Sequence, residues 1–514
     1  MKNFNVLKIR NCIWKRTTFF VVLLIFVSFN AFSQRIVHVK SGTELSSVIL
    51  GDTTDSGDRV DVNTIYELER DGFYPIAKEI NLNTTLHIRA EEGNGALPAI
   101  YPQKDASNKY PKVINAHGNV ILENIYLSNA NGPDANPKWG GFRVAGENSR
   151  VILKGCQFEY DKASTVQFRA NNIKLYMTNC IAAKTGNYAA YNGNGRLVDT
   201  RGYYADSIVV KNTTVYYMQD RVIRNMGGEI NYLEFNHVTV VNNQGMHGCF
   251  AMAKVHHAKI VNNLIINGEY GGDRLNDPEQ TGPEPDKKHI YMITMDTIYN
   301  DMTLEIHNNN FAFTSDLVSF FNSNDTIWKP MVLAPLVKQV LGKDTVNAYF
   351  EEPVTFNKMP DIPWDFLRAI YTNPQPSPMP NNWPDSIGIS NIDAGYASTY
   401  KSYTAAEGGL PLGDLQWEAG ITGIKKHNVN IGEVTLFPNP VRYMAQFHYS
   451  LKKDSEVTLT IYNITGQKIG QTKVKQLLGN QSLRYDTQGM LPGIYIYKLS
   501  TGENIRSGKL IIVK

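Results

Sequence analysis

Seven segments in the middle of the chain repeat one short pattern, in which an apolar alternating run breaks at Asn or Gly and then resumes. The segments read ILENIYL, ILKGCQF, YMTNCIA, VVKNTTV, LEFNHVTV, KIVNNLII and EIHNNNF. We call the residue at each break a pivot; the pivots are Asn124, Gly155, Asn179, Asn212, Asn236, Asn262 and Asn308. Successive pivots lie 31, 24, 33, 24, 26 and 46 residues apart. A fixed minimum with variable excess predicts a coiled solenoid, because each turn needs a set length of strand while its loops can lengthen.

The composition of the repeats indicates strands. The segments are rich in Val, Ile, Leu, Tyr and Thr, contain no Pro, and alternate with period two, unlike the helical repeats of ankyrin or tetratricopeptide arrays. The minimum of 24 residues, at roughly 3.3 Å per residue, supplies three short strands and three bends, and successive turns stack roughly 4.8 Å apart. We therefore predict an all-β chain whose core, residues 112–330, is a right-handed parallel β-helix.

Equivalent residues of neighbouring turns lie above one another in such a coil. A recurrent Asn at the bend can then hydrogen-bond to its neighbours along the stack, and Asn tolerates left-handed backbone. Cys156 and Cys180 each follow a pivot and lie 24 residues apart, which places them on adjacent turns. A disulfide and a reduced, inward-facing pair are both compatible with this spacing and with export.

The first 33 residues have the pattern of a secretory signal peptide. Basic residues such as Lys8 and Arg10 precede the apolar run 19–27, and Ala31-Phe32-Ser33 is a small-x-small cleavage site. No later segment approaches the eighteen uninterrupted apolar residues of a membrane span, so we expect a secreted, soluble mature chain. The net charge of +3 excludes a generally basic nucleic-acid binder.

The remaining parts of the chain differ from the repeat region in composition. Residues 34–111 are predicted to form an N-terminal cap and the first coils, because a solenoid needs its apolar end covered. From 331 to 432 the repeat is lost and Pro and Trp become frequent, which predicts an irregular segment along the flank of the coil and then a linker. Residues 433–514 alternate strands with Gly or Pro turns, which predicts a small antiparallel β-sandwich.

Several motifs of this tail agree in order with a known family. They are Leu436-Phe437-Pro438-Asn439-Pro440, VTLTIYNITGQKI (457–469), Leu491-Pro492-Gly493-Ile494-Tyr495 and the final GKLIIVK. The tail resembles the type A C-terminal sorting domain of the type IX secretion system of Bacteroidetes. The resemblance implies the type IX secretion machinery as a partner and passage across the outer membrane. It also implies removal of the domain and release or attachment at the cell surface.

A second resemblance concerns the coil. The segment YTAAEGGLPLGDLQW (403–417) resembles a closing segment that often follows the coil in Bacteroidetes members of the pectin lyase-like superfamily. This resemblance supports the parallel β-helix and does not by itself assign an activity.

An Arg stands ten to twelve residues before each of four successive pivots, at Arg143, Arg169, Arg201 and Arg224. The register predicts that these residues form a positive column on one face, continued by Lys254, two to four residues out of register, and by His247, His256 and His257. Stacked like charges repel, so an anionic species should compensate. One interpretation is an acidic polysaccharide, whose carboxylates or sulfates suit bidentate Arg donors. The other is pairing with nearby carboxylates such as Asp199 and Asp220.

Aromatic residues beside the column could pack against sugar rings while their hydroxyls keep polar partners. The candidates are Tyr203, Tyr204, Tyr216 and Tyr217. With Arg143, Arg169 and Arg201, we predict Tyr203 and Tyr204 as substrate-binding residues.

The pectin lyase-like resemblance implies β-elimination at a uronate. In lyases of that superfamily an Arg or Lys, its pKa lowered by charged neighbours and Ca²⁺, typically removes the C5 proton. This implies Arg224 or Lys254 as the base, with Arg169 and Arg201 binding carboxylates; Lys254 is chemically the easier base. His247 is a further candidate acid or base near neutral pH.

The acidic insertion NGEYGGDRLNDPEQTGPEPDKKH (267–289) is a candidate metal-binding segment. Its carboxylates could bind Ca²⁺ if they converge, and the alternative is a solvated loop that forms a wall of the groove. It lacks the spacing of an EF-hand, so the Ca²⁺ cofactor remains an expectation.

We predict a secreted or cell-surface polysaccharide lyase that cleaves an anionic, uronate-containing polysaccharide such as pectate, alginate or ulvan by β-elimination. Two alternatives remain open. One is a carbohydrate-binding or adhesive β-helix without chemistry. The other is a glycoside hydrolase, for which the Asn-Thr-Asp and Gly-His-Gly elements of polygalacturonases are not present but two carboxylates could still come from different turns.

Overall fold

The computed structural model describes two separate compact units, a coil within residues 34–418 and a small domain within 434–513. The described residues are 34–105, 107–129, 142–186, 194–245, 247–274, 289–365, 367–368, 392–418, 434–451, 453–463, 468–501 and 504–513. The predicted signal peptide lies outside them. None of the helices they form is long and apolar enough to cross a bilayer.

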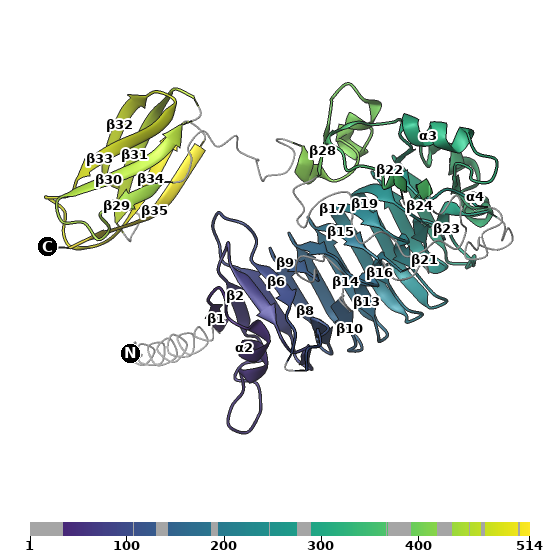
Figure 1. Cartoon of the computed structure of the whole chain (residues 1–514), viewed down its shortest axis with the longest axis horizontal. Coiled ribbons are helices and arrows are strands. Elements are labelled where there is room, and N and C mark those ends of the chain that lie inside the picture. The colour runs from purple at the N-terminus through teal and green to yellow at the C-terminus, as the bar shows by residue number, and fades with distance from the viewer. Residues whose placement is uncertain are drawn as a thin grey trace, which may run out of the picture. The chain divides into compact units, whose positions relative to one another are not determined.

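The coil consists of three parallel ladders of strands, which Figure 1 shows side by side along the coil. The first ladder contains β1 (Ile36–Val39), β2 (Ile65–Leu68), β5 (Leu86–Ala90), β8 (Val120–Glu123), β11 (Arg150–Lys154), β14 (Ile173–Thr178), the first halves of β17 (Ala205–Met218) and β19 (Glu229–Asn243), β21 (Lys254–Val261) and β24 (Thr303–His307).

The second ladder follows the first in each turn. It contains β3 (Phe73–Ile76), β6 (Ala99–Pro102), β9 (Tyr126–Ser128), β12 (Gln157–Glu159), β15 (Ile181–Thr185), the second halves of β17 and β19, β22 (Leu264–Gly268) and β25 (Asn310–Ala312). Because β17 and β19 run through the bend, hydrogen bonding joins the two ladders into one sheet of 17 strands.

The third ladder is a separate sheet of nine strands. It contains β4 (Ile80–Leu82), β7 (Ile114–Ala116), β10 (Phe142–Val144), β13 (Ser164–Phe168), β16 (Arg196–Asp199), β18 (Arg221–Arg224), β20 (Phe250–Ala251), β23 (Tyr291–Thr294) and β26 (Met331–Leu333). All its pairings are parallel, which confirms the predicted parallel β-helix.

The interior of the coil is an apolar stack built by period-two alternation. Along the third ladder, for example, Val166, Val198, Ile223 and Phe250 occupy equivalent inward positions and are fully buried. Each such side chain packs against its counterparts one turn above and below. Burial of a Val, Ile or Phe side chain stabilises the fold by about 1.5–3 kcal/mol, so the repeated alternation accounts for the continuous core.

The pivots form the bend between the first and second ladders. Asn124, Asn179, Asn262 and Asn308 have φ between 53° and 60°, in the left-handed region. The Asn262 side chain donates to Oδ1 of Asn236 at 3.0 Å, and that of Asn308 donates to Oδ1 of Asn262 at 3.4 Å. The predicted Asn stack is therefore present along these turns.

Cys156 and Cys180 are fully buried on adjacent turns and are both free thiols. Burial raises the pKa of Cys180 well above its ordinary value, and the contact with Cys156 raises it further. Of the two possibilities left by the sequence, the structure has the reduced pair.

The segment after the coil covers the last turn of the coil and the outer side of the second ladder. It contains α3 (Ser315–Asn322), α4 (Pro335–Leu341), the 3-10 helices η2 (Gly342–Asn347), η3 (Lys401–Tyr403), η4 (Glu407–Gly409) and η5 (Leu415–Trp417), and the two-stranded sheet β27 (Phe356–Lys358) and β28 (Asp393–Tyr396). The Asn242 side chain donates to the carbonyl of Pro360 at 2.7 Å, and Gly413 N–H donates to that of Asn262 at 2.8 Å. At the other end of the coil, α2 (Leu45–Gly51) buries Leu45 and Ile49.

Asp414 ties this segment to the coil. Its buried carboxylate accepts hydrogen bonds from the Thr214 hydroxyl at 2.7 Å and from Gln416 N–H at 3.1 Å. Trp417 Nε1 donates to the same Thr214 hydroxyl at 2.7 Å. Burial raises the pKa of Asp414 from 3.8 to about 7.

We expect Asp414 to make the stability of the coil depend on pH. Between about pH 4 and pH 7 the folded state keeps the Asp414 proton whereas the unfolded chain has lost it, so stability falls as pH rises through this window. Asp414→Asn should flatten this dependence. The measurement is urea unfolding of both proteins across the window, followed by tryptophan fluorescence. Parallel pH curves for parent and variant would contradict the assignment.

The second unit is a sandwich of two antiparallel sheets. One contains β29 (Thr435–Phe437), β30 (Met444–Leu451) and β33 (Gly479–Asp486), and the other contains β31 (Ser455–Asn463), β32 (Lys468–Gln476), β34 (Gly493–Thr501) and β35 (Asn504–Ile512). The rings of Phe447 and Tyr497 pack edge to face in its core, with their centroids 4.9 Å apart. The predicted antiparallel β-sandwich is confirmed.

Candidate functional site

Two of the four predicted arginines lie in one column of the third ladder, and the other two follow its strands. Arg143 pairs with Gln167, Gln167 with Asp199, and Asp199 with Arg224, so Arg143 and Arg224 share one column. Arg169 and Arg201 lie just after the ends of strands β13 and β16, and Arg201 has left-handed backbone with φ 55°. The charges of Arg169 and Arg201 both act on Arg143, so these three arginines lie near one another, but the four do not form the predicted single column.

Arg143, Arg169 and Arg201, which we call the arginine trio, lie close enough to interact electrostatically. Burial lowers the pKa of the half-buried Arg143, and the positive charges of Arg169 and Arg201 lower it further. Arg169 Nε donates to Gln167 Oε1 at 3.0 Å, and Arg201 is exposed. Among the described residues, no carboxylate lies within 4.0 Å of any of the three guanidinium groups. The carboxylate of Glu79 raises the pKa of Arg143 but forms no ion pair with it, so positive charge is gathered here without a paired carboxylate among the described residues.

Arg224 differs from the trio. It is only 8% exposed, and its Nε lies 3.5 Å from Asp199 Oδ1. Burial lowers its pKa from 12.5 to about 10, and the neighbouring Arg196 adds to this effect. The carboxylate pairing considered from the sequence therefore holds for Arg224.

A buried group of charges, which we call the Asp220 cluster, lies at the start of strands β16 and β18. Asp220 Oδ2 accepts from Arg221 Nε at 2.8 Å and from Arg196 Nε at 3.0 Å, and Oδ1 lies 3.1 Å from His247 Nδ1. Arg196 also reaches Asp199 at 3.5 Å. Burial by itself would raise the pKa of Asp220, but the positive charges of Arg221, His247 and Arg196 outweigh it and hold the pKa well below its ordinary value.

Sequence reasoning missed Arg196 and Arg221 in this cluster. They are register partners on adjacent turns, 25 residues apart. That spacing lies between the pivot spacings of 24 and 26 residues, so the signal was present in the sequence.

His247 is oriented by the cluster. In the neutral tautomer that donates Nδ1–H to the Asp220 carboxylate, the imidazole has a lone pair on Nε2, whereas the protonated ring carries the positive charge that lowers the Asp220 pKa. Nε2 makes no hydrogen bond to a described residue, and the side chain is 22% exposed. A backbone N–H of Arg201 donates to Asp199 at 3.1 Å, so hydrogen bonds and ion pairs connect the backbone of Arg201 to His247 through Asp199, Arg196 and Asp220.

Lys254 does not continue the arginine path. It begins β21 on the first ladder, where it pairs with Glu229. His256 and His257 lie on the same strand; His256 stacks on Tyr299 with ring centroids 4.1 Å apart. Lys254, His256 and His257 all lie past the next bend, on the first ladder. The prediction that they continue the positive column is therefore wrong.

The aromatic candidates divide by burial. Tyr203 and Tyr204 lie half-buried in the bend between the third and first ladders, beside Arg201. Tyr216 and Tyr217 are fully buried, and the Tyr217 hydroxyl donates to the carbonyl of Asp361 at 2.5 Å. Tyr216 and Tyr217 therefore cannot pack against a sugar, and that expectation is wrong.

The acidic insertion gives no metal site among the residues described. No group of three or more metal-ligating side chains is found there, and residues 275–288 of the insertion lie outside them. Asp273 pairs with His289 at 2.7 Å, and burial raises the pKa of Glu269 well above its ordinary value. The Ca²⁺ cofactor stays a prediction.

Comparison with known proteins concerns mainly the second unit. Residues 435–514 match the family described as "Secretion system C-terminal sorting domain". The tail carries a secretion sorting domain. It implies export by the type IX secretion machinery, as predicted from its motifs.

Other comparisons add little. Among solved structures, dimeric latent PorU from Porphyromonas gingivalis matches with 27% identity over 16% of this chain and a TM-score of 0.14. The match spans only 9% of the PorU chain. No curated protein matches the chain.

Proposed function

We propose that this exported protein, a pectin lyase-like β-helix, binds an acidic, uronate-containing polysaccharide on the third ladder and cleaves it by β-elimination. The observation that carries the proposal is the arginine trio, three neighbouring guanidinium groups without a paired carboxylate among the described residues. Arg donors bind carboxylates in bidentate geometry. A stack of turns offers such donors in series, as a polymer with one carboxylate per sugar requires.

The trio supplies the first part of the proposed mechanism. Charge-assisted hydrogen bonds to the uronate carboxylate would stabilise the negative charge that develops when the C5 proton leaves. Tyr203 and Tyr204, beside Arg201, are suited to contact the sugar ring.

His247 supplies the proposed base. Arg224 is paired with Asp199 and keeps a pKa of about 10, and Lys254 lies on another ladder, so both are weaker candidates than the sequence implied. Nε2 of His247 would take the C5 proton as the C4–C5 double bond forms and the C4–O bond breaks. The leaving oxygen then takes a proton from the imidazolium or from water. Asp220 fixes the ring and stabilises the imidazolium.

His247→Gln tests this role. We expect the variant to keep binding acidic polysaccharide but to form the unsaturated product, followed by its ultraviolet absorbance, at least about 100-fold more slowly, since a general base contributes about 10²–10⁴-fold. His257→Gln on the first ladder is the matched control and should react at the parent rate. An unchanged rate for His247→Gln would remove His247 from the mechanism.

The parent protein distinguishes the alternatives when incubated with pectate, alginate and ulvan. New reducing ends without the absorbance would show hydrolysis. Retention on an affinity gel without either signal would show a binding protein and contradict the lyase.

A further inference from the structure

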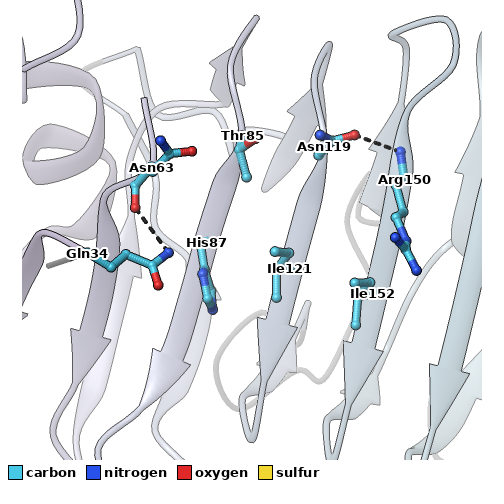
Figure 2. Close-up of a pocket in the computed structure, with 8 residues that line it drawn as sticks. All are labelled: Gln34, Asn63, Thr85, His87, Asn119, Ile121, Arg150 and Ile152. Carbon is cyan, nitrogen blue, oxygen red and sulfur yellow. Dashed lines mark hydrogen bonds between the residues drawn. The ribbon is translucent and has the colours of Figure 1, made fainter. Parts of the chain in front are cut away.

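The outer face of the first ladder has a depression of about 250 Å³ that belongs to a different ladder from the arginine trio. Figure 2 shows its lining residues, which are Gln34, Asn63, Thr85, His87, Asn119, Ile121, Arg150 and Ile152. The floor is a row across three neighbouring strands, because His87 pairs with Ile121 and Ile121 with Ile152. The two isoleucines are half-buried. The row presents a small, mostly apolar surface inside a polar rim.

The rim is rich in hydrogen-bond donors. Asn119 Oδ1 accepts from the backbone N–H of Arg150 at 2.8 Å, so its amide NH₂ remains available (Figure 2). Gln34 Nε2 donates to the carbonyl of Asn63 at 3.3 Å, and the Thr85 hydroxyl and Asn63 side chain have no partner among the described residues. Donors without partners favour a ligand rich in oxygen acceptors.

Arg150 adds one positive charge at the edge. Its guanidinium lies over the Tyr176 ring, 5.1 Å from the centroid, and no carboxylate among the described residues pairs with it. None of the lining residues is acidic. His87 Nε2 lies 3.1 Å from Glu123, outside the lining. The depression therefore suits a single negative charge.

We propose that this depression is an accessory glycan subsite that holds one acidic sugar residue of the polysaccharide. The choice of ligand rests on the proposed function. A volume below the roughly 300–1,000 Å³ of drug-sized ligand sites fits a single sugar ring. The ring would lie on Ile121 and Ile152, its hydroxyls would meet the amides of Asn63 and Asn119, and its carboxylate would meet Arg150. Such a subsite would hold a second stretch of polymer while the third ladder holds the first.

The test uses the full mature chain with Arg143→Ala, Arg169→Ala and Arg201→Ala as background, which silences the proposed groove. Calorimetric titration with trimers of galacturonate, mannuronate and glucuronate should show about one weak site for at least one of them. Adding Arg150→Ala should weaken it roughly tenfold or more, as expected for a charge-assisted contact. Lys154→Ala, on the same strand with the same charge change, is the matched control and should bind as the background does.

Several outcomes would overturn the subsite. They are no binding of any acidic trimer to the background, equal binding with and without Arg150, or equal binding of a neutral glucose trimer. Arg150-dependent binding of inorganic phosphate alone would show a simple anion site instead. Each of these results leaves the proposed function standing, because that function is tested by the His247 variant on polymer.

Discussion

Replacing all three trio residues, Arg143, Arg169 and Arg201, with alanine is expected to weaken binding of acidic polysaccharide by about 100-fold. Hydrogen bonds to charged groups contribute about 1.5–3 kcal/mol each, less where solvent screens them. A total near 3 kcal/mol corresponds to roughly a 100-fold change in Kd. Affinity electrophoresis at low and high salt measures the loss, and the variant should also lose most of its salt dependence.

A control with the same change in net charge separates the site from the overall charge. Lys40, Lys338 and Lys343 are exposed and pair with no described carboxylate, so their triple alanine variant removes three positive charges elsewhere. It should bind nearly as the parent does. Equal weakening in both variants would show that the trio has no special role.

Asp220→Ala is expected to destabilise the coil by about 3–5 kcal/mol, because it leaves buried Arg196 and the largely buried Arg221 without their common partner. The His247 ring would also lose its hydrogen bond. Urea unfolding followed by tryptophan fluorescence measures the loss. Every Trp outside the predicted signal peptide precedes the sorting domain in the sequence, so the fluorescence reports on the first unit and not on the sandwich.

Asp206→Ala is the matched control. Asp206 lies 3.8 Å from Lys174 on the first ladder with 35% of its side chain exposed, and an exposed pair contributes at most about 1 kcal/mol. If Asp220→Ala cost no more than Asp206→Ala, the Asp220 cluster would not stabilise the coil.

The fold was predictable because the same strand length recurs along the chain. The pivots marked the bend between the first and second ladders, and the structure has left-handed backbone and Asn–Asn hydrogen bonds there. A second left-handed column at the far end of the second ladder was not foreseen. It contains Tyr160, Lys184, Tyr217, Asn242 and Asn267, and its mixed residue types gave no visible repeat.

The candidate site was predictable only in part. Counting back from the pivots brought Arg143, Arg169 and Arg201 near one another, but a tolerance of two residues could not separate a strand position such as Arg143 from a position after the strand such as Arg201. For the same reason Lys254 was predicted beside the arginines, although it lies past a bend, on the first ladder. Tyr216 and Tyr217 are fully buried. A strand pattern alone could not predict this, because a covering loop can also bury residues on the outer face of a strand.

The sequence by itself determined the coil, the sandwich and the sorting signal of this protein, because periodic strands and ordered motifs are local properties of the chain. Only the tertiary structure decided which arginines are paired and which are not. Arg196, Arg221 and Arg224 meet carboxylates in the buried corner, whereas the trio does not. The physical reason is that an ion pair depends on distances of a few ångströms between residues of different turns, and a repeat spacing fixes the turn but not the side-chain contact.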